Sequence, residues 1–137
     1  MTPVYFTDRD LGKQFPDILR AAGLTVERHT DHFAHDTADE DWLQAIGQRG
    51  WVAITHDGRI RYKTNEREAV LRHNVSLLVI VGKVKYSELA SAFIATEPKV
   101  RDFVAKTNPP FIAKVYRGAV SATNAVYSPG RIERWFP

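Results

Sequence analysis

The spacing of apolar side chains predicts strands and helices in alternation along the chain. Short apolar or β-branched runs predict strands, and apolar positions three and four residues apart predict helices. We expect strands at 4–6, 24–26, 51–55, 75–81 and 111–116. We expect helices at 11–22, 39–49, 64–73 and 86–106, the last interrupted near Pro98. Residues 29–38 have no apolar period, which predicts a loop.

Alternating strands and helices predict a three-layer α/β/α fold with a mainly parallel central sheet. The run at 75–81 is apolar almost throughout, which is typical of a strand buried on both faces. The chain has 137 residues, so we expect a single domain over 1–137. The segment from 117 to 137 is aromatic and basic, and its pattern assigns it no element.

Acidic residues follow two of the predicted strands. Asp8 comes just after the first strand, and Asp57 comes just after the strand at 51–55. The helix that begins at Asp39 leads into this second strand, so its first turn is also expected at the carboxyl edge of the sheet. Clustered carboxylates repel one another unless a cation or protons relieve them. Three converging acids without cysteine would suit Mg²⁺ or Mn²⁺.

Each acid also has an ordinary structural explanation. Asp8 or Asp10 could cap the first helix, because a short carboxylate accepts hydrogen bonds from its free backbone N–H groups. Asp57 could shape a tight turn with the glycine that follows it. Acids in the first turn of a helix are favoured by its dipole. This explanation covers Asp39, Glu40 and Asp41.

Several other classes of site lose their usual support. The chain has no cysteine, which excludes disulfides and thiolate sites. Glycine-rich phosphate loops, HExxH and GxSxG are also missing from the sequence. His29, His32 and His35 recur at a spacing of three, but they lie in the aperiodic segment and are weak zinc candidates. The longest apolar run is too short to cross a bilayer and the amino terminus has no signal-peptide pattern, so we expect a cytoplasmic protein with no membrane partner.

Charge is distributed unevenly along the chain. Residues 1–60 carry six Lys/Arg and ten Asp/Glu, a net charge of −4, whereas residues 61–137 carry 13 and six, a net charge of +7. An acidic site beside a cationic surface would attract a polyanion such as nucleic acid. Aromatic residues lie among the cations near the carboxyl terminus, where they could stack bases or equally form an edge strand or a protein contact.

Two segments carry a resemblance to a known family. FTDRDLGKQFPDILRAAG and DEDWLQAIGQRGWVAITHDGRI, within roughly residues 4–81, resemble the PIN-like domains of VapC-like toxin ribonucleases from bacterial type II toxin–antitoxin pairs. The second segment contains the WL…GW…T-x-D-x-R-I pattern of that branch. The resemblance implies a PIN-like fold and metal-dependent cleavage of RNA phosphodiester bonds.

The resemblance also implies roles for individual residues. Asp8, Asp39 and Asp57 stand at the positions of the metal-binding catalytic acids, so they are expected to hold Mg²⁺ or Mn²⁺. Arg59 and Lys13 are expected to contact the substrate phosphate. Four residues could share or support these roles, and they are Asp10, Glu40, Asp41 and His56. A fourth acid found in many PIN domains has no counterpart after Asp57.

The expected partners are an RNA substrate, a cognate antitoxin protein that masks the acids and a second copy of the chain in a homodimer. A second hypothesis is a PIN-like module that binds nucleic acid or a protein without cleaving, its acids serving only as helix caps. A titration with Mg²⁺ and Mn²⁺ would separate the two hypotheses, because a bound cation stabilises the folded protein.

Overall fold

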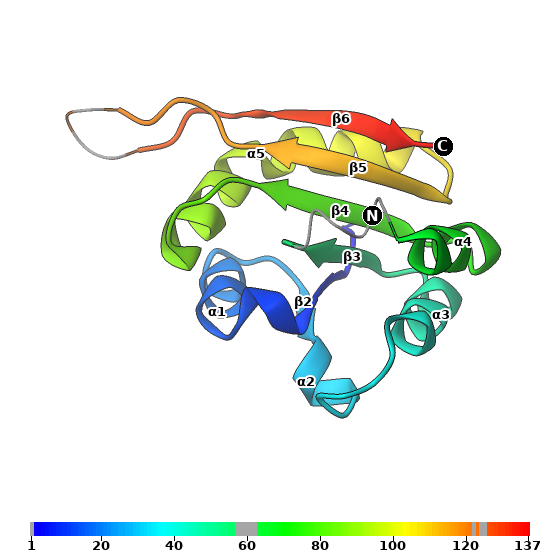
Figure 1. Cartoon of the computed structure of the whole chain (residues 1–137). Coiled ribbons are helices and arrows are strands. Elements are labelled where there is room, and N and C mark those ends of the chain that lie inside the picture. Colours follow the sequence, from blue (N-terminus) through cyan, green and yellow to red (C-terminus); the bar gives the residue numbers. More distant parts are fainter. Residues whose placement is uncertain (1, 57–62, 122, 124–125) are drawn as a thin grey trace.

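The computed structural model describes residues 2–56, 63–121, 123 and 126–137. Two predicted site residues, Asp57 and Arg59, lie outside these ranges. A six-stranded sheet runs through the molecule in the order β2-β1-β3-β4-β5-β6 (Figure 1). The strands are β1 (Tyr5–Thr7), β2 (Val26–Arg28), β3 (Val52–Thr55), β4 (Ser76–Val81), β5 (Phe111–Tyr116) and β6 (Arg131–Phe136). All neighbouring pairs are parallel except β5 and β6.

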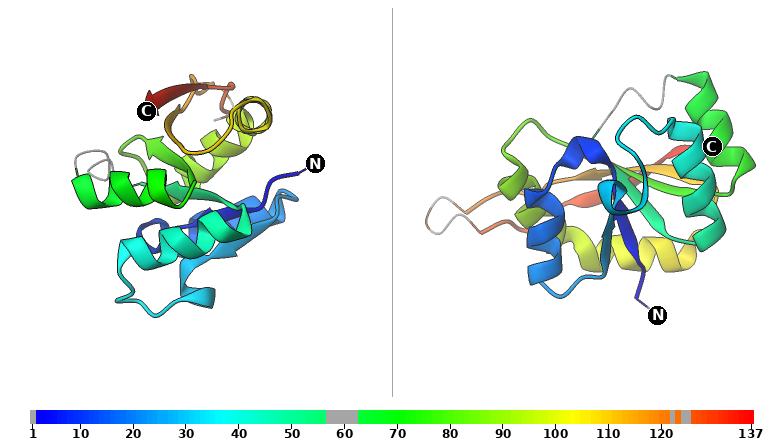
Figure 2. Two further views of the ribbon diagram at one scale, coloured as in Figure 1. Left: turned by 90° about the vertical axis from the view of Figure 1, so that its right-hand side faces the viewer. Right: turned by 90° about the horizontal axis from the view of Figure 1, so that it is seen from below.

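Helices cover both faces of this sheet, which confirms the predicted three-layer α/β/α fold. They are the 3-10 helix η1 (Arg9–Leu11), α1 (Gln14–Ala21), α2 (His29–His32), α3 (Asp39–Arg49), α4 (Thr64–Arg72) and α5 (Tyr86–Lys106). One face packs against α1 and α5, and the other packs against α3 and α4. The two views of Figure 2 show the twisted sheet between these layers. No described helix is long and apolar enough to cross a membrane.

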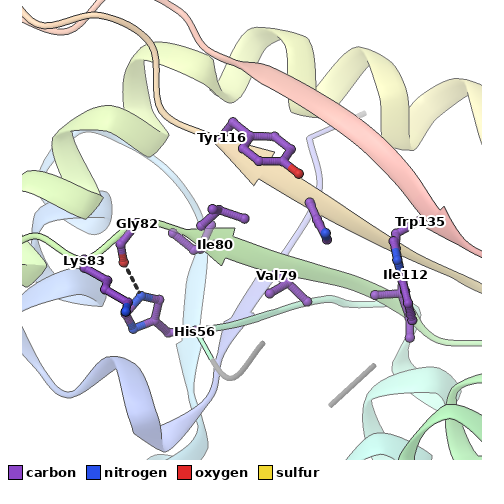
Figure 3. Close-up of a pocket in the computed structure, with 10 residues that line it drawn as sticks. His56, Val79, Ile80, Gly82, Lys83, Ile112, Tyr116 and Trp135 are labelled. Carbon is purple, nitrogen blue, oxygen red and sulfur yellow. Dashed lines mark hydrogen bonds between the residues drawn. The ribbon is translucent and has the colours of Figure 1, made fainter. Parts of the chain in front are cut away.

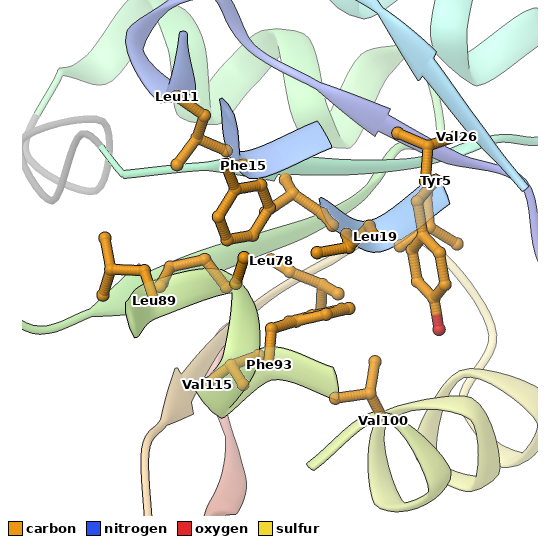
Figure 4. Packing of buried hydrophobic residues seen from close by; sticks show 14 of the residues in the cluster. Tyr5, Leu11, Phe15, Leu19, Val26, Leu78, Leu89, Phe93, Val100 and Val115 are labelled. Atoms are coloured by element: carbon orange, nitrogen blue, oxygen red, sulfur yellow. The ribbon is translucent and has the colours of Figure 1, made fainter. Parts of the chain in front are cut away.

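The alternation of side chains along each strand builds two apolar cores. Tyr5 of β1 and Leu78 of β4 point into the first core, where Phe15 and Phe93 fill the space against α1 and α5 (Figure 4). Phe6 points the opposite way, into the second core. The inner strands are therefore apolar on both faces, which explains why a near-continuous apolar run identified them in the sequence.

Three expectations about the elements were wrong in detail. The second strand begins at Val26, because the N–H of Leu24 still bonds to the carbonyl of Leu19 and closes the end of α1. Residues 29–32 form the short helix α2 within the expected loop. The helix α5 continues through Pro98, because packing in the first core on both sides of the proline outweighs the loss of one N–H donor.

The carboxyl-terminal segment, which the sequence pattern left unassigned, forms β6 at the edge of the sheet. Its start is anchored to α5 at Gly130. The N–H of Gly130 donates to Thr96 Oγ1 (2.9 Å), and Lys99 Nζ donates to the carbonyl oxygen of Gly130 (2.8 Å). Ile112 and Ala113 of β5 pair with Phe136 and Arg134 of β6. The extra residue between the two partners, Trp135, forms a β-bulge in β6.

Candidate active site

Two carboxylates meet at the carboxyl edge of the parallel sheet, and we call Asp8 and Asp10 the acid pair. Asp8 follows β1 and caps η1, its Oδ1 accepting from the N–H of Arg9 (2.7 Å). Thr55 ends the neighbouring strand β3, and its Oγ1 lies 3.0 Å from Asp8 Oδ2 and 3.1 Å from Asp10 Oδ2. A hydroxyl has a single hydrogen, so it donates to only one of the two carboxylates at a time.

Asp10 is fixed by the backbone of the residue after β3 and by the start of α5. The N–H of His56 donates to Asp10 Oδ2 (3.1 Å), and the Tyr86 hydroxyl donates to the carbonyl oxygen of Asp10 (2.7 Å). The His56 ring is held as well, because its Nε2 donates to the carbonyl oxygen of Gly82 (2.7 Å). His56, a predicted supporting residue, therefore lies beside the acid pair.

The pKa of Asp8 is raised from 3.8 to about 6, first by burial and then by the nearby charge of Asp10. The N–H of Arg9, the Thr55 hydroxyl and the Arg9 charge oppose this rise without cancelling it. Asp8 is only 8% exposed, so at neutral pH the protein holds a buried negative charge beside a second carboxylate. A bound cation would relieve that repulsion.

Arg9 joins Asp8 to Asp39, the acid that begins α3. Its guanidinium lies 3.9 Å from Asp8 Oδ1 and 3.3 Å from Asp39 Oδ1, which also accepts from Trp42 Nε1 (2.9 Å). The structure thus brings Asp8 and Asp39 to one edge of the sheet, but with a cation between them. Arg9 also contacts Nε2 of the buried His29 (2.9 Å). A guanidinium can only donate, so Nε2 is the acceptor. Burial and then the Arg9 charge lower the pKa of His29, which favours the neutral ring.

Three other predicted residues, Lys13, Glu40 and Asp41, do not contact the acid pair through any hydrogen bond or ion pair described here. Lys13 is exposed, and it lines a hollow of about 150 Å³ together with Asp8, Arg9 and Arg28. Glu40 forms an ion pair with Arg72 of α4, and Asp41 is exposed on α3. The hollow beside Asp8 therefore combines one acid with three cations.

The described residues supply only some of the donors that a metal ion would need. Among residues 2–56, 63–121, 123 and 126–137, no group of three or more His, Cys, Asp or Glu side chains is placed to hold a metal ion. The acid pair supplies carboxylate oxygens, which suit Mg²⁺ or Mn²⁺. The predicted ligands were Asp8, Asp39 and Asp57, of which Asp57 lies outside the described residues. The described donors fit such a cation in chemistry but do not complete its site.

Two neighbours of Asp8 received too little weight in the prediction from sequence. The first is Asp10, whose separation from Asp8 by one residue at the end of a strand was the available signal. The second is Thr55, the threonine before Asp57 in the T-x-D pattern, which contacts both members of the acid pair. No sequence signal indicated that Arg9 would lie between Asp8 and Asp39, because that contact depends on the direction of one long side chain.

Comparison with known proteins adds a finding about the same part of the chain. The model of a family described as a PIN-like domain matches residues 3–82, which is more than half of the chain. The match includes the acid pair, Thr55 and Asp39. No curated protein and no solved structure matches the chain.

Proposed function

We propose that this chain, which belongs to the PIN-like domain family, is a metal-dependent endoribonuclease and the toxin of a toxin–antitoxin pair. Domains of this family have a nuclease-type fold and are commonly nucleases. The activity would be hydrolysis of RNA phosphodiester bonds at the carboxyl edge of the sheet, where ligands bind in open α/β folds.

The observation that carries this proposal is the acid pair. Two carboxylates share one hydroxyl donor, and burial and mutual repulsion raise the pKa of one of them. Capping η1 needs only Asp8, so it does not explain why Asp10 lies beside it. Titratable groups whose pKa values are shifted by burial and by a neighbouring charge are typical of functional sites.

In this proposal, Mg²⁺ or Mn²⁺ would be held by the acid pair together with Asp57, with Asp39 as a further ligand. A bound divalent cation polarises a phosphoryl oxygen and lowers the pKa of bound water. Thr55 and the N–H of His56 hold the carboxylates in position. The cations of the hollow beside Asp8, with Arg59, would contact the phosphates of the RNA.

The antitoxin would mask this edge by presenting basic side chains to the acids. Arg9 already pairs with Asp8 and Asp39 within the chain, which supports the idea that a cation from a partner is accepted here. A homodimer, cytoplasmic location and the role as a toxin remain parts of the proposal. Growth arrest on expression, relieved by the product of the neighbouring reading frame, is the expected outcome in cells.

The decisive experiment in vitro compares Asp10→Asn with Asp36→Asn, an exposed aspartate in the loop before α3. Wild-type protein and Asp36→Asn are expected to cleave labelled RNA when Mg²⁺ or Mn²⁺ is added, and Asp10→Asn is expected to lose cleavage. The cation should also raise the melting temperature of wild type but not of Asp10→Asn. Undiminished cleavage by Asp10→Asn from a nuclease-free preparation would refute the role of the acid pair.

A second candidate function is a non-catalytic PIN-like module that binds nucleic acid or a protein. One observation favours it, namely that Asp8 caps η1 and is already close to the Arg9 cation. If the melting temperature of the wild-type protein ignores both cations while the protein still binds RNA, this candidate replaces the ribonuclease.

A further inference from the structure

A β-bulge turns two neighbouring aromatic side chains toward the same face of the sheet. Ile112 pairs with Phe136 and Ala113 pairs with Arg134, so the register passes over Trp135, which is the extra residue of the bulge. In a regular strand Trp135 and Phe136 would point to opposite faces. Both instead pack against the second core. Bulges commonly redirect side chains near functional sites.

Trp135 thereby forms one wall of a hollow of about 350 Å³, which we call the β4–β6 hollow. Val79 and Ile112 form its apolar floor, and Tyr116 and His56 lie toward its other end (Figure 3). Its volume is at the lower end of the roughly 300–1,000 Å³ typical of small-ligand pockets. One nucleotide with its base is a suitable occupant for a hollow of this size.

The charge of the β4–β6 hollow favours an anionic occupant. Lys83 and Lys114 line it. Glu133 lies opposite Lys114 in the register, but its carboxylate pairs with Arg131 (3.3 Å). Arg131 also lies over the ring of Tyr116, 4.2 Å from its centre. The hollow therefore combines aromatic surfaces with cations, the combination that binds bases and phosphates of single strands.

One residue, His56, contacts both the β4–β6 hollow and the acid pair. The His56 ring lines the hollow, while the N–H of the same residue donates to Asp10 Oδ2. A strand with one nucleotide in the hollow would place a neighbouring phosphate toward the acids. We infer that the β4–β6 hollow binds one unpaired nucleotide of a single-stranded RNA beside the phosphate to be cleaved. This inference rests on the proposed function for its link to cleavage.

The test measures binding separately from cleavage. A fluorescein-labelled single-stranded RNA of mixed sequence is titrated with protein in EDTA, and fluorescence anisotropy is recorded at several salt concentrations. Lys114→Gln is compared with Lys106→Gln, a matched change at an exposed lysine of α5 on the other face of the sheet. Removing one phosphate contact is expected to reduce the slope of log K against log salt by about 0.7. Lys106→Gln should leave the slope unchanged.

The aromatic wall has its own matched pair of variants. Trp135→Leu is expected to weaken binding by at least about fivefold, because stacking on one base is lost. Trp51→Leu, which changes another half-buried tryptophan packed against the second core, should bind as wild type does. Melting curves show which variants are folded. If Trp135→Leu unfolds, Lys114→Gln still tests the hollow, because it replaces only the charged end of the side chain and is expected to fold.

Three results would overturn the inference. They are failure of the wild-type protein to bind the single strand, unchanged binding by both hollow variants, and equal binding of a duplex of the same sequence. Because EDTA removes any metal, the result is independent of cleavage. Binding that depends on the hollow without cleavage in added cation refutes only the ribonuclease, whereas cleavage without such binding refutes only the nucleotide site.

Discussion

Replacement of Asp8 by Asn tests whether the acid pair costs the protein stability. The pKa of Asp8 in the folded protein is about 6, against 3.8 ordinarily, with burial as the main cause and Asp10 as the second. Between these values the folded state binds more protons than the unfolded state, so the free energy of unfolding falls as pH rises. It stays lowered above about pH 6. A shift of about two units at about 1.4 kcal/mol each gives about 3 kcal/mol.

Asp8→Asn removes the charge but keeps an oxygen that can accept from the N–H of Arg9. In a buffer without divalent cations, the variant is expected to be more stable than wild type by up to about 3 kcal/mol near neutral pH. The advantage should shrink as pH falls below about 6 and disappear below 3.8, where Asp8 becomes protonated in both states. Urea unfolding followed by tryptophan fluorescence at a series of pH values measures both quantities.

The exposed Asp36 provides the control, because Asp36→Asn is expected to change stability by no more than about 0.5 kcal/mol. The reasoning is wrong if Asp8→Asn is less stable than wild type at neutral pH, or if its stability declines with pH as steeply as that of wild type. The first result would mean that the other contacts of the Asp8 carboxylate outweigh the cost of its buried charge, and the second that Asp8 does not cause the pH dependence. Added Mn²⁺ should narrow the difference, since it stabilises only the protein that keeps both acids.

Substitutions at three further positions test contacts of the candidate site and the packing of α3. Thr55→Val is expected to cost about 1–3 kcal/mol in urea unfolding, because it removes the hydroxyl donor of the acid pair, whereas Thr55→Ser should cost less. Gly47→Ala is expected to lower the free energy of unfolding by about 1–3 kcal/mol, because the new Cβ would overlap the carbonyl oxygen of His73. Unchanged stability would contradict the close approach of α3 to the backbone of His73. Arg9→Gln should raise the pKa of His29 in an NMR titration, because burial remains but the neighbouring charge is lost; a pKa that does not move would exclude the Arg9 contact as a cause.

The parallel part of the fold was predictable because its inner strands are buried on both faces. The runs that form β3 and β4 are apolar almost throughout, and the helix between them, α4, buries Ala69 and Val70. An edge strand was only one of several alternatives for the segment that forms β6, because only half of the residues of β6 are apolar and charges interrupt them. Its identity depends on antiparallel pairing with β5, which no local pattern encodes.

The edge that carries the candidate site was predictable from topology alone. Parallel pairing of β1 with β3 places the carboxyl ends of both strands together, so Asp8, which follows β1, meets Thr55, which ends β3. The companion of Asp8 was harder to identify, because η1 turns Asp10 back toward Thr55 through a tight helical turn. The position of Arg9 between two acids likewise depends on tertiary contacts. The predicted roles of Asp57 and Arg59 stay predictions.

The anchor of β6 at Gly130 has a consequence for the dynamics of the molecule. β6 has a neighbour on one side only, and its start is tied to α5 through Thr96 and Lys99. Edge strands of this kind open locally at a smaller free energy than global unfolding, so their amide hydrogens exchange early. Such an opening would move Trp135 but leave the acid pair in place. If the β4–β6 hollow holds the RNA and the acid pair cleaves it, as we propose, binding and cleavage belong to parts of the sheet that open at different rates.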